Sequence, residues 1–491
     1  MTALAYAGPR EAATDPAGVT GQLCAWLADF SLNDVPAETR ARAKDLILDG
    51  LGCALVGAQL PWSRTAVEAM ARLEGPGPAT LIGWDRGMAA PAAALLNGAF
   101  IQGFELDDFH PLGPLHSASL LLPALLALSD MQPVSGARFL EAAVAGFEVG
   151  PRVGMALHGA QMLSRGWHSG AVFGTHAAAV ASGVVLGLDA ARFEDALGLA
   201  GTQSGGLMAA QYEAMCKRMH HGFAARAGLT AACLAAGGYT GIKRVFERDY
   251  GGFLSVFGEG HAPEAARIVS GLGERWETQR ITIKPYAAMG ALHAPLDALF
   301  ELARRRPLKA DEIERMDVYM SHAAYHHGWW PLERPITPIA AQMNVGYALA
   351  AATLDGAAMV RQFTPDRIDR DDVWALIPRI AAHHEDAFDT GGPAGRGRTR
   401  LTVRFTDGAE ETVELSAPRT ATQPLDGAGV EAKFRALTDG IVEDDRREAI
   451  VALVRDLETV SDMRALTALL APSVGAAFED EGPLAAGRAI G

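Results

Sequence analysis

The sequence predicts a mainly α-helical protein into which an α+β domain is inserted. Apolar residues recur at three- and four-residue spacing from residue 19 to about residue 269, which is typical of amphipathic helices. Between residues 276 and 419 several short stretches alternate as β-strands do, and helical spacing returns after Pro424. Because 491 residues exceed what one hydrophobic core usually supports, we expect two domains.

The larger domain is predicted to be all-helical and to be formed by both ends of the chain, residues 19–275 and 420–475. In residues 37–58, apolar positions follow Pro36 on one face and Gly57 ends the run. Small residues dominate several later segments, so their backbones should approach closely. The other predicted helices of this domain are 63–73, 91–103, 117–130, 136–159, 168–187, 190–200, 218–237, 260–270, 428–439, 443–455 and 461–471.

Residues 276–419 are predicted to form the smaller α+β domain. Residues 277–284 and 316–320 alternate between apolar and polar side chains, as strands do. Two more strands, 400–405 and 411–415, flank Thr406-Asp407-Gly408, a turn typical of a hairpin. Helical spacing lies between the strands, at 290–305 and 342–354.

The two ends of the chain are rich in glycine and alanine. Such termini are poorly ordered unless other elements tie them down. We therefore expect a disordered N-terminal tail over residues 1–18 and a flexible C-terminal tail over residues 476–491.

Composition and charge exclude several classes of partner. The net charge of −15 argues against nucleic acid, which needs a basic surface. The longest apolar runs, 118–128 and 170–188, are too short or too rich in small residues to span a membrane, so they predict buried helices.

The four cysteines form no CxxC pair, and the sequence does not begin with a basic segment followed by an apolar one. We expect reduced thiols in a cytoplasmic protein.

The densest group of ionisable residues lies at 105–116. Three carboxylates (Glu105, Asp107 and Asp108) and two imidazoles (His110 and His116) fall within twelve residues beside an apolar, helix-like segment. Such groups are costly to bury unless they are paired or used, and acid–base chemistry is found in clusters of this kind. The alternative is that Asp107 and Asp108 cap the next helix and Glu105 is solvated.

Two further segments bring imidazoles and cations. His168 begins a predicted helix, where the helix dipole disfavours its protonated form and suits a neutral base or a donor to an anion. Residues 216–226 hold five potential cations in an acidic protein, and on a helix Lys217 and His221 would share a face. With Arg218 they suggest a pocket for carboxylates. A histidine packed at a helix start and a solvated basic patch are the alternatives.

Lys284 ends a predicted strand and is followed by Pro285 and Tyr286. A lysine on a rigid edge can neutralise a substrate carboxylate or, if desolvated, act as a base. His293 lies one helical turn into the next segment. A plain strand-end lysine is the alternative.

The motifs that redox, phosphoryl-transfer and zinc enzymes need are missing. We find no GxGxxG after a strand, no GxxxxGK[ST], no GxSxG and no HExxH. The histidine pairs 326–327 and 383–384 show no metal-ligand spacing. The sequence therefore carries no signal for these classes of enzyme.

Taken in order, these motifs resemble the MmgE/PrpD family over nearly the whole chain. The order and spacing of the matching segments together make the resemblance specific. They are residues 49–57, 96–98, 105–108, 187–189, 196–201, 217–220, 238–241, 284–286, 407–408 and 433–434.

The resemblance implies a large helical domain from both chain ends, an α+β lid domain and small di- or tricarboxylate substrates bound between them. It also implies a homodimer without metal or organic cofactor. Glu105 stands where the family usually has aspartate. The family's functional positions correspond here to Glu105, Asp108, His116, His168, Lys217, Lys284 and His293.

These observations predict a cofactor-independent lyase that removes the proton α to a carboxylate and dehydrates a 2-methylcitrate-like substrate. Lys217 and Lys284 would neutralise carboxylates, and one of them or His168 would be the base. His116 would protonate the leaving hydroxyl, while Glu105 and Asp108 would orient the cations. The predicted substrate-binding residues are Arg218, His221, Tyr286 and His293.

Three alternatives stay open. An epimerase or isomerase of an iminodisuccinate-type acid would use the same groups with a base on each face. A cis-aconitate-type decarboxylase would lose carbon dioxide instead of water. A catalytically silent binding protein would hold a carboxylate without turning it over.

Overall fold

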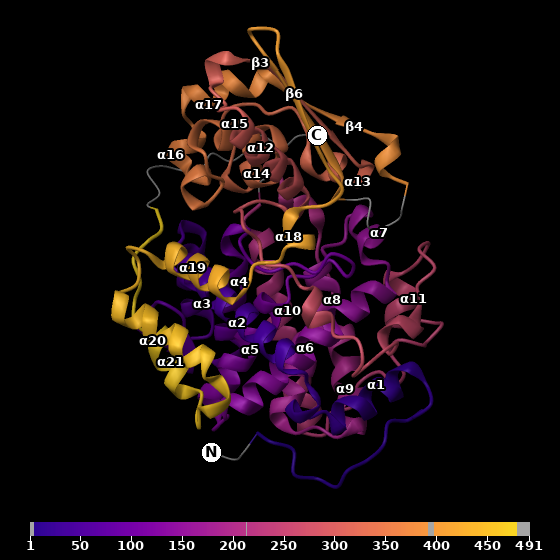
Figure 1. Cartoon of the computed structure of the whole chain (residues 1–491). Coiled ribbons are helices and arrows are strands. Elements are labelled where there is room, and N and C mark those ends of the chain that lie inside the picture. The colour runs from indigo at the N-terminus through magenta and orange to yellow at the C-terminus, as the bar shows by residue number, and fades with distance from the viewer. Residues whose placement is uncertain (1–3, 213, 391–396, 479–491) are drawn as a thin grey trace.

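The computed structural model describes residues 4–212, 214–390 and 397–478. Figure 1 shows a large helical domain with a smaller α+β domain above it. This is the mainly helical, two-domain architecture that the sequence predicts. The predicted boundaries at residues 275 and 419 stay predictions.

The centre of the helical domain is a layer of closely packed helices. Helix α8 contacts α6 and α10, and α10 also contacts α4 and α9. Glycines allow this approach: a Cβ at Gly222 of α10 would lie 2.0 Å from the carbonyl oxygen of Leu95 in α4. The helices of this part are α1 (Val19–Asp29), α2 (Ala37–Gly57), α3 (Pro61–Leu73), α4 (Ala90–Ile101), α5 (Ala118–Met131), α6 (Gly136–Ala156), α7 (Gly159–Ser164), α8 (Ser169–Leu186), α9 (Ala190–Gly201), α10 (Cys216–Ala236) and α11 (Phe253–Phe257).

The C-terminal helices complete this domain, as predicted. Helix α19 (Gly427–Thr438) packs along α2, and α21 (Arg464–Leu470) contacts α5 and α20 (Asp444–Arg455). A Cβ at Gly52 of α2 would lie 2.9 Å from the Phe434 ring of α19. Lys433 of α19 forms a buried 2.6 Å ion pair with Asp49 of α2.

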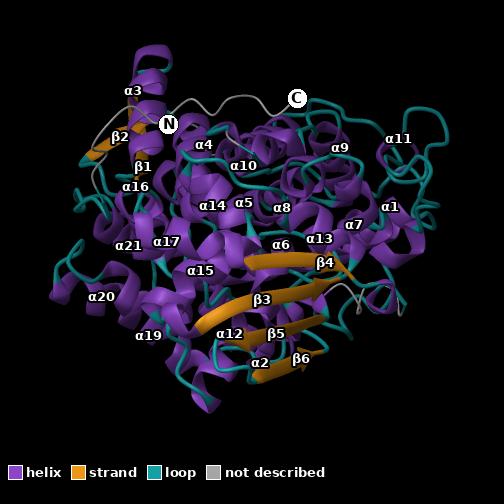
Figure 2. Cartoon of the chain, turned by 90° about the horizontal axis from the view of Figure 1, so that it is seen from above, coloured by secondary structure: helices purple, strands orange, loops and turns teal. Residues whose placement is uncertain are grey.

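The α+β domain, which we call the lid domain, is built on a four-stranded sheet in the order β4-β3-β5-β6 (Figure 2). Strand β3 (Ile313–Met320) runs parallel to β4 (Ile380–His384) and antiparallel to β5 (Thr399–Phe405). The predicted hairpin is confirmed: β5 pairs with β6 (Glu410–Leu415). The lid helices are α12 (His293–Arg305), α13 (His322–Gly328), α14 (Pro338–Met343), α15 (Val345–Asp355), α16 (Pro365–Ile368), α17 (Asp371–Leu376) and α18 (Arg419–Thr422).

Two predicted segments differ from the structure. Residues 277–284 are not a sheet strand but a short 3-10 helix, Glu277–Arg280, followed by one isolated bridge between Thr282 and Phe109. The predicted helix 260–270 is reduced to a 3-10 turn, Ala265–Ile268. A small hairpin, β1 (Pro76–Leu81) with β2 (Arg86–Met88), was not predicted.

The ends of the chain differ from a simple pair of tails. Residues 4–18, expected to be disordered, lie along the ends of α8 and α9. The backbone amide of Tyr6 donates to the carbonyl of Leu186, and that of Glu11 donates to the Asp189 carboxylate, both at 2.8 Å. Residues 1–3, and the predicted flexible tail from residue 479 on, lie outside the described residues.

Helix α8 is apolar and long enough to cross a membrane by length and composition. Its whole length is buried inside the helical domain, and α2 and α3 pass the same criteria only as a pair bent by 83°. Both observations fit core helices, as the sequence analysis expected for residues 170–188.

Candidate active site

The site is assembled around Glu105, which follows the 3-10 turn Gln102–Phe104 at the end of α4. Its backbone is left-handed, with φ of +56°, a conformation that side chains other than glycine adopt at an energetic cost. This turn directs the carboxylate into the interior, where the residue is 2% exposed.

Two lysines from distant segments hold this carboxylate. Lys217, in the first turn of α10, pairs with Oε1, and Lys284 pairs with Oε2 at 3.0 Å. The Nζ of Lys284 also donates to the Glu105 carbonyl at 3.3 Å. All three residues are buried, so three segments that are distant in the sequence meet at this carboxylate.

Electrostatics keep Glu105 ionised. Burial alone would raise the pKa of Glu105, but the ammonium groups of Lys217 and Lys284 hold it well below its usual value. Burial lowers the pKa of Lys217, an effect that the Glu105 carboxylate opposes. One carboxylate between two ammonium groups leaves the triad with a net positive charge when both lysines are protonated, which suits an anionic ligand.

Four imidazoles form a second cluster beside Lys217. His168 begins α8, His220 and His221 lie in the first turns of α10, and His116 precedes α5. Ring centroids are 4.6 Å apart between His168 and His220, 5.2 Å between His168 and His221, and 5.3 Å between His116 and His221. Gly170 makes room for this cluster, because a Cβ there would lie 2.1 Å from Nε2 of His221.

Three of these imidazoles are held neutral. Burial and the neighbouring cationic groups lower the pKa of His168 and His221 well below the usual value, and they lower that of His220 to about 4. Ser119 donates its hydroxyl hydrogen to the carbonyl of His116, so it accepts from Nδ1 of His221 at 2.6 Å. The Nε2 atom of neutral His221 is then an acceptor.

Several buried nitrogens of this cluster have no hydrogen-bond partner within the described part of the chain. They are Nδ1 of His168 and His220 and Nε2 of His221. Nδ1 of His116 also makes no hydrogen bond but faces a carboxylate. Buried polar atoms are normally satisfied, so a group of open ones indicates a place where a polar ligand binds.

The two aspartates have different environments. Asp108 accepts from the backbone amides of Ser117 and Ala118, at 2.8 and 2.9 Å, and thereby caps the start of α5. It pairs with neither lysine of the triad, so the capping alternative, rather than the orientation of cations, describes its contacts. Asp107 instead lies 3.4 Å from Nδ1 of His116.

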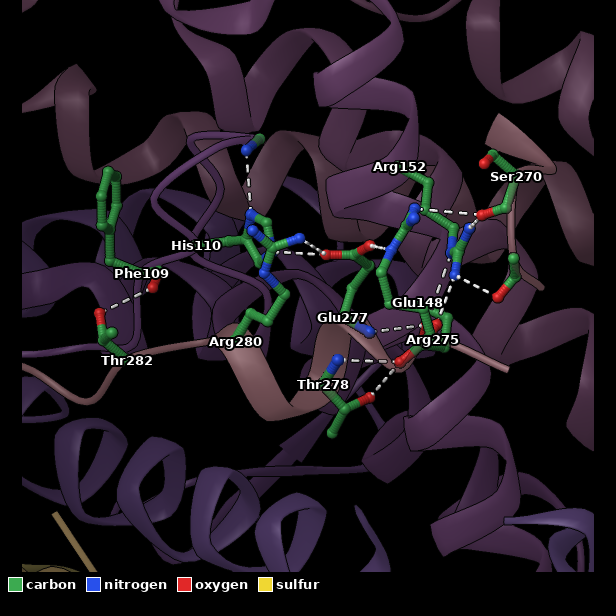
Figure 3. Close-up of polar contacts among 12 residues, drawn as sticks. Phe109, His110, Glu148, Arg152, Ser270, Arg275, Glu277, Thr278, Arg280 and Thr282 are labelled. Atoms are coloured by element: carbon green, nitrogen blue, oxygen red, sulfur yellow. Dashed lines mark hydrogen bonds and ion pairs between the residues drawn. The ribbon is translucent and has the colours of Figure 1, made fainter. Parts of the chain in front are cut away.

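His110 belongs to a separate buried network, shown in Figure 3. The amide of Gly113 donates to its Nδ1 at 2.9 Å, so its Nε2 carries the proton and donates to Glu277 at 3.2 Å. Although burial raises the pKa of Glu277, hydrogen bonds from His110 and Arg275 bring it down to about 2. His110 therefore has a structural role.

The same network explains why residues 277–284 are not a strand. The buried carboxylate of Glu148 in α6 accepts from the backbone amides of Glu277 and Thr278, at 2.9 and 2.8 Å. Phe109 and Thr282 then exchange backbone hydrogen bonds of 2.7 and 2.8 Å. The Thr282 hydroxyl also donates to the Phe109 carbonyl at 2.9 Å (Figure 3). This pairing fastens the 105–116 loop to the segment that carries Lys284.

The predicted substrate-binding residues separate into groups. His221 lies in the imidazole cluster, as described. Arg218 donates to the carbonyl of Gly103 at 2.6 Å and to the side chain of Gln342 at 3.1 Å, and its guanidinium lies over the Trp62 ring. Its contacts are thus structural.

Tyr286 and His293 form their hydrogen bonds within the lid domain. Tyr286 donates to Asp297 at 2.8 Å, and Nε2 of His293 donates to the carbonyl of Ala288 at 3.0 Å. Burial and then the charge of Lys284 lower the pKa of His293 to about 3. His293 therefore stays neutral close to the triad.

Gln342 of α14 was not predicted. Its Nε2 donates to the carbonyls of Phe104 and Ala287, at 2.8 and 3.0 Å, while its Oε1 accepts from Arg218. It thereby joins the lid domain to both sides of the triad. A lone glutamine in a helical segment carries no sequence signal for such a role.

Comparisons with known protein families match both parts of the chain. The model of the MmgE/PrpD N-terminal domain matches residues 21–266, and that of the MmgE/PrpD C-terminal domain matches residues 286–459. Together these matches cover most of the chain.

Named relatives match over nearly their full length. A cis-aconitate decarboxylase-like protein of Aspergillus oryzae is 44% identical, over 93% of this chain and 98% of its own. Cis-aconitate decarboxylase of Aspergillus terreus is 42% identical, over 92% and 96%. The human protein of that name is 27% identical, over 87% and 89%.

Replacing Glu105 by glutamine should destabilise the fold. The variant leaves two buried ammonium groups without their carboxylate, so the free energy of unfolding should fall by about 3–5 kcal/mol in urea denaturation. The exposed Glu68→Gln control makes the same chemical change on the surface and should shift stability by less than about 0.5 kcal/mol. The double variant Glu105→Gln/Lys217→Met should regain part of the loss. Equal stability of Glu105→Gln and the wild type would contradict the ion triad.

Asp108 gives a pH-dependent prediction. Burial and the nearby Asp107 raise its pKa from 3.8 to about 8, so the folded state keeps a proton that the unfolded state loses. Stability from this group is therefore lost as pH rises between these two values. Relative to Asp108→Asn, the wild type should lose up to about 1.4 kcal/mol per pH unit from about pH 5 to pH 8, measured by urea unfolding. A difference that stays constant from pH 5 to pH 8 would instead mean that Asp108 is ionised in the folded protein.

Proposed function

The chain belongs to the MmgE/PrpD family, and we propose that it is a carboxy-lyase that decarboxylates a small unsaturated tricarboxylate of the cis-aconitate type. One observation carries the choice of reaction: the relatives named for cis-aconitate decarboxylation are 42–44% identical over 92–93% of this chain. The dehydration that the sequence analysis placed first is the competing reaction.

The charges around Glu105 support binding of a polyanion. Lys217 and Lys284 each use a contact to Glu105 and retain further N–H donors on the ammonium group. The neutral imidazoles add donors and acceptors without adding charge. Such a site can bind two carboxylates through cations and leave a third without a cationic partner.

The proposed reaction balances without a redox partner. The bond between the methylene carbon of cis-aconitate and its carboxylate breaks, and carbon dioxide leaves. The electron pair of that bond forms a new double bond to the central carbon. The pair of the old double bond takes one proton at the vinylic carbon, which gives 2-methylenesuccinate.

Residue roles follow from this balance. The reaction needs a proton donor, and His116 is suited to it because Asp107, at 3.4 Å from Nδ1, can orient its ring. Lys217 and Lys284 would hold the two carboxylates that remain in the product. A cation on the departing carboxylate would oppose its loss, so a site with few cations and several neutral imidazoles fits decarboxylation.

We also propose a homodimer in the cytoplasm, both carried over as expectations from the sequence. Several large apolar side chains are exposed on the helical domain, which favours a partner surface. They are Phe223, Leu234, Tyr239, Tyr250 and Val256. Light scattering on the purified protein tests the dimer, and a monomer at all concentrations would contradict it.

The decisive experiment is proton and carbon NMR in deuterated buffer with cis-aconitate, citrate and 2-methylcitrate supplied separately. We expect cis-aconitate to give 2-methylenesuccinate with one deuterium at the former vinylic carbon. Carbon dioxide should carry a carbon label that was placed in the methylene-bound carboxylate of the substrate. Dehydration of 2-methylcitrate without any decarboxylation would replace the proposal by the hydro-lyase.

The same assay tests the proton donor. His116→Gln should lower the rate of decarboxylation by about 10²- to 10⁴-fold, because it removes the general acid. His261→Gln, in the loop after α11, is the matched control and should leave the rate unchanged. Retention of the full rate in His116→Gln would assign the proton donor elsewhere.

A further inference from the structure

Three histidines that are far apart in the sequence meet on the rim of the lid domain. His322 and His326 lie one turn apart on α13, and His384 ends the neighbouring strand β4. All three are exposed. Figure 1 shows α13 and β4 side by side at this edge of the lid.

The His322 ring lies between the other two imidazoles. The ring centroids of His322 and His326 are 4.1 Å apart, and those of His322 and His384 are 5.3 Å apart. Histidines at positions i and i+4 of a helix point from the same face, which is the spacing of a two-histidine metal ligand pair.

Two carboxylates complete the group. Nε2 of His384 lies 2.5 Å from Asp389 and 3.6 Å from Asp386, and one ligand atom from each of these three residues lies within 4.8 Å of the others. The other oxygen of Asp389 accepts from the backbone amide of His322 at 2.8 Å. Asp389 thus ties the end of β4 to the start of α13.

We propose that His322, His326 and His384, with Asp386 or Asp389, form a binding site for a late first-row divalent transition metal such as Zn²⁺. Imidazoles with a carboxylate suit zinc, nickel and copper, whereas calcium and magnesium take oxygen ligands. Because the five side chains are exposed, they can rotate to bring their ligand atoms onto one ion. The histidine pairs 326–327 and 383–384 gave no such signal, because the ligands come from both segments.

A metal at this site would fix the position of part of the lid domain and would take no part in the proposed reaction. His322 and His326 also line a cavity of about 530 Å³ between the lid and the helical domain, opposite Met208 and Gln211. A metal bound by α13 and β4 would fix the position of this cavity wall. The catalytic residues proposed above take no part in it.

The test is isothermal titration calorimetry of the untagged full chain with zinc chloride, with cobalt absorption as a second measurement. We expect about one equivalent to bind at the rim, and cobalt to show the visible bands of a site with nitrogen ligands. His384→Ala and His326→Ala should each weaken this binding by about 10- to 100-fold. These exposed substitutions should leave the thermal unfolding temperature of the metal-free protein unchanged.

His383→Ala is the matched control. His383 is the neighbouring residue on β4 but points to the opposite face, where it contacts Asp317 at 2.6 Å. The His383→Ala variant should bind zinc as the wild type does. Absence of binding, or binding that His384→Ala and His326→Ala leave intact, would overturn the proposal. Neither result depends on whether cis-aconitate is decarboxylated.

Discussion

One buried carboxylate between two lysines is the constraint on which the site depends. Glu105 comes from the loop before α5, Lys217 from α10 and Lys284 from the segment that enters the lid domain. None of the three could be buried alone without a large desolvation cost, so their pairing fixes three distant parts of the chain against one another. The imidazole cluster then takes its place beside Lys217.

A second buried network makes this pairing possible. Glu148 and Glu277 organise the residues that precede Lys284, and His110 connects them to the loop that carries Glu105. Residues that look catalytic in the sequence thus divide into two groups. One group, Glu105 with the two lysines and the imidazole cluster, forms the candidate site. The other group, which includes His110, holds the segments of the first group in position.

Periodicity was sufficient to predict most of the helices, the hairpin β5–β6 and the return of the C-terminal helices to α2. It could not separate His110 from His116, since both share one acidic segment and only tertiary contacts distinguish them. Residues 277–284 alternate as a strand does, yet a carboxylate of α6 captures their amides. The role of Gln342 could not be predicted from the sequence, because it depends on hydrogen bonds to backbone carbonyls of residues far away in the chain. Motif order indicated the family, and named relatives favoured one reaction within it.

The packing of α19 on α2 has a consequence for synthesis of the chain. Some 370 residues separate these helices. The face of α2 that carries Gly52 therefore stays uncovered until nearly all of the polypeptide has left the ribosome. The lid, encoded between them, can assemble while its host is still incomplete. A nascent chain of this topology keeps the α2 residues that pack on α19 exposed until late in translation, and apolar surface exposed at that stage is prone to aggregate.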